Sequence, residues 1–155
     1  NKGLEHYRNS LKIAEKIGER QYAAMTLINI AITHYNKGDY EKAKEYLEKG
    51  ISINKELGFK TTEDLYPFTY LYLCYKHLNK VYDENRIFSL IKEADYIEME
   101  INFRLYEFLE DTSYLETAYK EVQEIADSMD EELKEKFLNY PIPKQILEEW
   151  NKINN

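Results

Sequence analysis

The residues of this chain that come closest to a chemical site are Cys74 and His77, three positions apart. On a helix this spacing places a thiolate and an imidazole on one face, where both can bind zinc. A closed zinc site needs about four ligands, and the chain has one cysteine and three histidines. The other two, His6 and His34, lack the His-Glu-x-x-His or Glu-x-x-His spacing of helical metal sites. We therefore expect no metal site, and we expect Cys74 and His77 to be packing residues.

Other catalytic patterns are missing from the sequence. It contains no glycine-rich phosphate loop and no nucleophile elbow. Acidic residues are plentiful, but solvated helix faces explain them more simply than a general acid and base pair. We therefore expect no enzyme, no catalytic residue and no cofactor.

Composition favours an all-α chain of one domain. Its 155 residues are 43% hydrophobic, which is enough for a core or for several stacked hairpins. Three prolines and five glycines are few for this length, as expected for helices. The apolar run Leu65–Tyr75 is far shorter than the roughly 18 residues of a membrane span, and no stretch of these residues resembles a signal peptide. A lone cysteine cannot form an intrachain disulfide, so we expect a reducing, cytoplasmic setting.

The charge is acidic and uneven. The net charge is -8, and it argues against nucleic acid, where affinity comes mainly from cations on phosphates. Residues 1–60 hold 11 Lys/Arg against 8 Asp/Glu, whereas residues 61–155 hold 10 against 21. We interpret the charge runs as solvated helix faces and expect neither a nucleic acid nor a membrane partner.

The most regular stretch, residues 22–58, predicts two amphipathic helices joined by residues 36–39. Apolar and small residues recur every three or four positions in both halves, which is helical spacing. Gly38 stands where a left-handed residue ends a helix, and Asp39 is a good N-cap for the next one. Small residues within the stripes predict a tight antiparallel hairpin. These small residues are Ala31, Ala43 and Gly50.

This hairpin resembles a tetratricopeptide repeat. The resemblance rests on Leu27, Ile30-Ala31, His34, Gly38-Asp39-Tyr40, Ala43, Leu47 and Gly50. The hairpin departs from the family pattern at three positions: Leu27 replaces the Trp, His34 replaces the Tyr, and Lys55 is found where a Pro often closes the repeat. The resemblance implies an α-solenoid, a stack of antiparallel helix hairpins with about eight helices, that acts as a binding scaffold.

The first helix, residues 2–17, aligns with the second helix of the hairpin at a shift of 40, which places Gly18 on Gly58. It is half a repeat without its partner helix, and there is no initiator Met, so we expect a fragment of a longer repeat protein. One of its two apolar stripes is left uncovered, and we expect self-association there. The expected divisions of the single domain are 1–18 (half repeat), 19–58 (best repeat), 59–95 and 96–128 (degenerate repeats) and 129–155 (C-terminal capping helices).

Later segments follow the pattern less closely. A turn is expected at residues 79–80, and Val81 stands where the central repeat has Gly38. A helix break is expected at residues 94–96. Ser113 with Glu116, and Ser128 with Glu131, predict capping boxes. The tail, mainly residues 137–150, is similar to the end of tetratricopeptide regions of large signalling ATPases and transcription regulators.

The resemblance implies a concave groove that holds a peptide. Asn29 matches the Asn that many family members bond to a peptide backbone, because an amide both donates and accepts. Apolar residues stand where the carboxylate-binding variety has Lys and Arg, so we do not expect a C-terminal carboxylate as ligand. The alternative is that the rings only pack between helices. The predicted peptide-binding residues are Met25, Ile28, Asn29, Ile32, Tyr35, Asn36, Phe68, Tyr72, Tyr75 and Asn79.

Two functions follow from this sequence. The first is a protein-protein interaction scaffold that binds a peptide or protein segment, either of a separate partner or of another domain of the parent chain. The second is a regulatory or sensor segment of a larger signalling ATPase or transcription regulator. A phosphate-binding loop or a helix-turn-helix in the parent's upstream sequence would favour the second.

Overall fold

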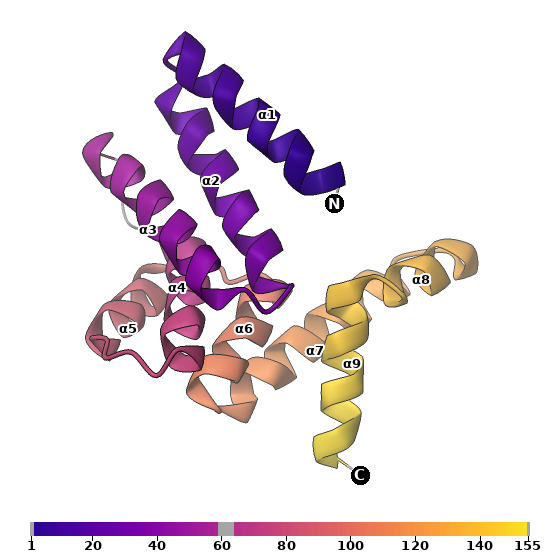
Figure 1. Ribbon diagram of the computed structural model, residues 1–155. Helices are drawn as coiled ribbons and strands as arrows, with labels where there is room; N and C mark the ends of the chain where they lie inside the picture. The colour runs from indigo at the N-terminus through magenta and orange to yellow at the C-terminus, as the bar shows by residue number, and fades with distance from the viewer. Residues whose placement is uncertain (1, 59–63, 155) are drawn as a thin grey trace. The chain divides into compact units, whose positions relative to one another are not determined.

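The computed structural model describes residues 2–58 and 64–154 of the chain. Within these ranges it forms nine helices and no strand, so the all-α prediction is confirmed (Figure 1). The chain divides into two compact units, residues 1–95 and residues 96–155. Each unit has its own helix packing and is described separately.

The first unit is a series of neighbouring helices. Each helix packs on the next one along the chain, and α2 also contacts α4. Figure 1 shows α1, α2 and α3 side by side, as expected for a tetratricopeptide-like stack. The helices are α1 (Lys2–Ile17), α2 (Arg20–Tyr35), α3 (Tyr40–Glu56), α4 (Leu65–His77) and α5 (Glu84–Glu93).

The turn between α2 and α3 forms as predicted. Gly38 has φ +75°, and its N–H donates to the carbonyl of Tyr35 at 2.8 Å. The N–H of Asp39 donates to the carbonyl of His34 at 3.0 Å, which completes a Schellman motif. The Asp39 carboxylate then accepts from the N–H of Lys42 and caps α3. Hydrogen bonds between residues close in sequence therefore end α2 and begin α3.

The same motif ends α4 at the predicted turn, residues 79–80. Asn79 has φ +52°, and its N–H donates to the carbonyl of Lys76, while Lys80 N–H donates to the carbonyl of Tyr75. Asn79 thus takes the place of Gly38, and the alignment of Val81 with Gly38 is off by two positions. The physical reason is that asparagine tolerates the left-handed region, whereas a β-branched valine does not.

The helices α2 and α3 approach most closely at Gly50. A Cβ atom there would lie 3.0 Å from Cγ1 of Ile28 and 3.1 Å from the carbonyl oxygen of Ala24. Contacts of this length are shorter than ordinary van der Waals packing. The hairpin therefore depends on the missing side chain at this position.

The helix α4 is buried on most of its surface, as its apolar sequence predicts. It packs against α3, α2 and α5, and Pro67 lies in its first turn, where a missing N–H costs no helical hydrogen bond. Cys74 is fully buried, and burial raises the pKa of its thiol to about 12. The buried residues of α4 are Leu65, Pro67, Thr69, Tyr70, Leu71, Tyr72, Leu73 and Cys74.

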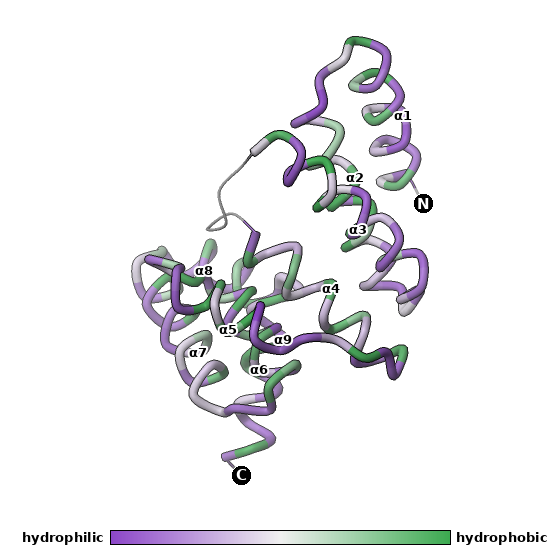
Figure 2. Tube along the Cα trace, turned by 90° about the vertical axis from the view of Figure 1, so that its left-hand side faces the viewer, coloured by the Kyte–Doolittle hydropathy of each residue, from purple (hydrophilic) through white to green (hydrophobic). Residues whose placement is uncertain are grey.

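The helix α1 buries one of its two apolar stripes. Leu4 and Ala14 are buried, whereas Ile13 and Ile17 are 60% and 65% exposed. Figure 2 shows hydrophobic and hydrophilic residues alternating along this helix. Self-association through the exposed stripe stays a prediction, as does the division of the chain into repeats.

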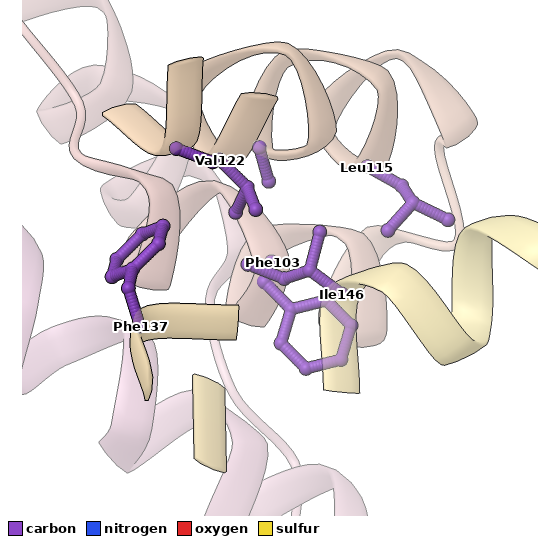
Figure 3. Packing of buried hydrophobic residues seen from close by; sticks show 7 residues of the cluster. Phe103, Leu115, Val122, Phe137 and Ile146 are labelled. Carbon is purple, nitrogen blue, oxygen red and sulfur yellow. The ribbon is translucent and has the colours of Figure 1, made fainter. Parts of the chain in front are cut away.

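The second unit is a bundle around one small core. Its helix α7 contacts α6, α8 and α9, and the buried side chains converge between them (Figure 3). The stacked rings of Tyr119 and Trp150, 4.6 Å apart, add to the packing of α7 on α9. The helices are α6 (Met99–Leu109), α7 (Thr112–Asp127), α8 (Glu131–Leu138) and α9 (Pro141–Asn154). The core residues are Phe103, Leu115, Ala118, Val122, Ala126, Phe137 and Ile146.

Two predicted helix caps in this unit are each wrong by two residues. Asp111 caps α7 by accepting from the N–H of Ser113, so Ser113 lies inside the helix. Asp130 caps α8 by accepting from the N–H of Leu133, in place of Ser128. Aspartate and serine are both strong N-caps, and each aspartate stands directly before the first helical residue.

The close approach at Gly50 gives a stability prediction. We expect Gly50→Val to lower the free energy of unfolding by about 1–3 kcal/mol, because the new side chain overlaps the α2 backbone. The matched control is Gly3→Val, at a helical glycine whose Cβ would meet nothing within 4 Å. Urea unfolding followed by circular dichroism measures both variants. Equal stability of the two variants would contradict the prediction.

Candidate functional site

A pocket of about 400 Å³ lies in the first unit between α2, α3 and α4. Rings, aliphatic carbons and one thioether form most of its wall, with amides and one carboxylate between them. A mostly apolar hollow with a few polar groups is the usual form of a ligand site. The lining residues are Glu19, Gln21, Tyr22, Met25, Ile28, Asn29, Asn54, Tyr66 and Pro67.

Three helices position this pocket. The helix α2 and its N-cap Glu19 supply most of the lining, α3 supplies Asn54 near its end, and the first turn of α4 supplies Tyr66 and Pro67. The closeness of α2 and α3 at Gly50 brings Asn54 to the side of Asn29. The site is therefore a product of the hairpin packing.

The two asparagine side chains of the pocket have no hydrogen-bond partner within the described ranges. Asn29 is half-buried, and besides its helical backbone bonds its carbonyl accepts from the hydroxyl of Thr33, so the side-chain amide is not used. An amide offers two donors and an oxygen acceptor. These groups are therefore available to a peptide backbone or another polar ligand.

Three of the predicted binding residues line the pocket, namely Met25, Ile28 and Asn29. Further along α2, Ile32 is half-buried and Asn36 is exposed, and neither belongs to the lining. Tyr35 is 8% exposed, and its ring meets the edge of Tyr70 with centroids 5.1 Å apart. It packs α2 against α4, which is the alternative that the sequence left open for the rings.

The four predicted residues of the α4 segment lie away from the pocket. The hydroxyl of Tyr72 donates to the carbonyl of Asp83 at 3.2 Å, and its ring stacks on Tyr82. The hydroxyl of Tyr75 donates to Glu48 at 3.0 Å. Phe68 lies 5.4 Å from the guanidinium of Arg86, and Asn79 forms the turn. Within the described structure these residues pack or turn, and their binding role stays a prediction.

The register of α4 explains this difference. Because Asn79 matches Gly38, the position equivalent to Met25 is Tyr66, and the position equivalent to Asn29 is Tyr70. Tyr66 and Met25 indeed both line the pocket. Pairing Gly38 with Val81 shifts every residue of α4 by two, which is more than half a helical turn.

Sequence reasoning missed six lining residues: Glu19, Gln21, Tyr22, Asn54, Tyr66 and Pro67. Glu19, Tyr22, Met25 and Asn29 follow one another at spacings of three, three and four. The helical period alone could therefore have added Glu19 and Tyr22 to the predicted residues. An alignment on Asn79 could have found Tyr66. Asn54 has no comparable signal, because it belongs to the other helix of the hairpin.

Residues 2–58 and 64–154 show neither a metal site nor a membrane-spanning helix. These residues include no group of three His, Cys, Asp or Glu side chains that could hold a metal ion. His77 stacks on the ring of Tyr40 at 4.0 Å, away from any metal geometry. No helix in the same ranges is long and apolar enough to cross a membrane.

Comparison with known proteins agrees with the packing of α1 to α3. Residues 1–56 match the tetratricopeptide repeat family. A relative, the photosystem I assembly protein Ycf3 of Rippkaea orientalis, is 37% identical over 54 residues, which is 35% of this chain. The match spans 30% of the length of that relative. No solved structure matches the chain. The resemblance inferred from the hairpin is thus confirmed for the part that holds the α2–α3 repeat.

The phenol of Tyr75 gives a pH prediction. Burial, followed by the hydrogen bond to Glu48, raises the pKa of Tyr75 from 10.0 to about 12. The folded chain therefore keeps this proton at a pH where the unfolded chain releases it. This contribution to stability is fully present below pH 10.0 and is lost as the pH rises towards about 12.

We expect Tyr75→Phe to lose stability less steeply than the wild type when the pH rises from about 9 to about 11. The matched control is Tyr140→Phe, at a 61% exposed tyrosine of the second unit. Urea unfolding at each pH measures the slope. Parallel slopes for Tyr75→Phe and the wild type would show that this phenol does not titrate as described.

Proposed function

We propose that this chain is a protein interaction module whose α2–α4 pocket binds an extended segment of a partner protein. The observation that carries the proposal is the pair of asparagine amides, Asn29 and Asn54, without a hydrogen-bond partner among the described residues, in a mostly apolar pocket. Apolar side chains of a segment fill such a wall, and its backbone bonds to amides of this kind. Tetratricopeptide repeats, which match residues 1–56, are typically scaffolds without catalysis.

The relative's name also describes an assembly protein, which suits a scaffold. A second hollow of about 410 Å³ lies between α1, α2 and α3. Its polar lining is Glu15, Lys49, Ser52 and the phenol of Tyr46, with no amide among its described residues. The amides favour the α2–α4 pocket as the peptide site.

The test is the Asn29→Ala variant. Peptides are first selected from a random display library on the immobilised chain, and their affinity is then measured by calorimetry. We expect the variant to weaken binding about threefold to tenfold, which corresponds to the loss of about one net hydrogen bond. Its melting temperature should change by less than about 2 °C, because the lost amide has no intramolecular partner among the described residues.

The matched control is Asn9→Ala, an exposed asparagine on α1 outside the pocket. It should leave both affinity and melting temperature unchanged. If Asn29→Ala instead melts several degrees lower and binds normally, Asn29 is a structural residue and the proposed groove is wrong.

A further inference from the structure

A stripe of four different chemical groups runs along the first half of α2. Glu19, Tyr22, Met25 and Asn29 follow one another at spacings of three, three and four, so they share one helix face. Tyr22 is 47% exposed and Met25 is 51% exposed, although both line the pocket. A ligand along this face meets a carboxylate, a phenol, a thioether and an amide in turn.

The carboxylate of Glu19 is the charged group of this lining. No Lys or Arg is found among the described lining residues. Glu19 stands at the N-cap of α2, but its side chain makes no capping bond and has no ion-pair partner in the described part of the chain. The adjacent Arg20 does not neutralise it, because its guanidinium bonds to Glu56 on α3.

The wider charge of the first unit does not select a ligand. Residues 1–95 carry 15 Lys/Arg against 14 Asp/Glu, whereas residues 96–155 carry 6 against 15. The long-range field of a nearly neutral unit is weak. Selection by charge at the pocket therefore depends on local groups. The partial positive charge at the start of α2 already has a carboxylate beside it in Glu19.

These groups suit a guanidinium. An arginine side chain bonds to a carboxylate and stacks on an aromatic face at the same time. Tyr22 and Tyr66 supply the rings, and the sulfur of Met25 adds a polarizable contact. An acidic side chain would lose its hydration here and lie near the Glu19 carboxylate, which is unfavourable on both counts.

We infer that the pocket recognises a basic segment, in which an arginine stands beside a large aliphatic residue. The guanidinium pairs with Glu19 over the tyrosine rings, the aliphatic side chain contacts Met25 and Ile28, and the peptide backbone bonds to Asn29 and Asn54. A volume of about 400 Å³ accommodates more than one side chain. This inference rests on the proposed function of the same pocket and adds the chemistry of its ligand.

The experiment uses three blocked peptides that differ at one residue. They are acetyl-Ala-Ala-Leu-X-Ala-Ala-amide, with arginine, glutamine or glutamate at X. Each is titrated into the full chain, and the side-chain amide signals of Asn29 and Asn54 are followed by NMR. We expect the arginine peptide to bind most tightly, followed by glutamine and then glutamate.

The variant Glu19→Gln identifies the source of the preference. It should weaken the arginine peptide about threefold at low salt, the scale of an exposed ion pair, and leave the glutamine peptide unchanged. The matched control is Glu45→Gln, an exposed carboxylate of α3 outside the pocket, which should change neither affinity.

The outcomes separate the two proposals. If all three peptides shift the asparagine signals with equal affinity, or if Glu19→Gln leaves the arginine peptide unchanged, the basic ligand is wrong and the peptide groove stands. If no peptide shifts these signals, both the groove and its ligand class are overturned. Arginine-selective binding that is lost in Glu19→Gln supports both.

Discussion

The first unit depends on the contact between two helix backbones at Gly50. No side chain separates α3 from α2 there, because a Cβ atom would meet Ile28 and the Ala24 carbonyl at about 3 Å. Fully buried side chains of both helices, such as Ile30 and Leu47, extend this contact along the hairpin. Close approach increases the number of van der Waals contacts, and their sum stabilises the pair.

The candidate site follows from this contact. The pocket takes Asn54 from α3 and Asn29 from α2, and these residues are 25 positions apart in the sequence. A larger side chain at position 50 would separate the two helices and move the amides of Asn29 and Asn54 apart. The same small residue thus stabilises the hairpin and places two polar groups where a ligand can reach them.

The aromatic residues of the first unit divide between those that pack helices together and those that line the pocket. Tyr35 and Tyr70 meet edge to face, and Tyr40 stacks on His77, so these rings hold α4 against the hairpin. Tyr22 and Tyr66 lie in the pocket wall. The two groups lie at different positions along the helices: Tyr35 is the last residue of α2, whereas Tyr22 and Tyr66 lie in the first turns of α2 and α4.

The sequence by itself determined the helices and the α2–α3 turn. Apolar periodicity marks a helix, and Gly38 with Asp39 ends one helix and begins the next, because these effects act within a few residues. The repeat pattern also placed Met25, Ile28 and Asn29 on one helix, and these three predicted residues line the pocket. The tertiary structure decided the register of α4 and the contribution of Asn54. Asn54 enters the pocket through contacts between residues distant in sequence, and local patterns carry little information about those contacts. The turn at residues 79–80 could be predicted from the sequence, but the repeat alignment placed Val81 on Gly38, and the backbone conformation of Asn79 shows that Asn79 is the equivalent residue.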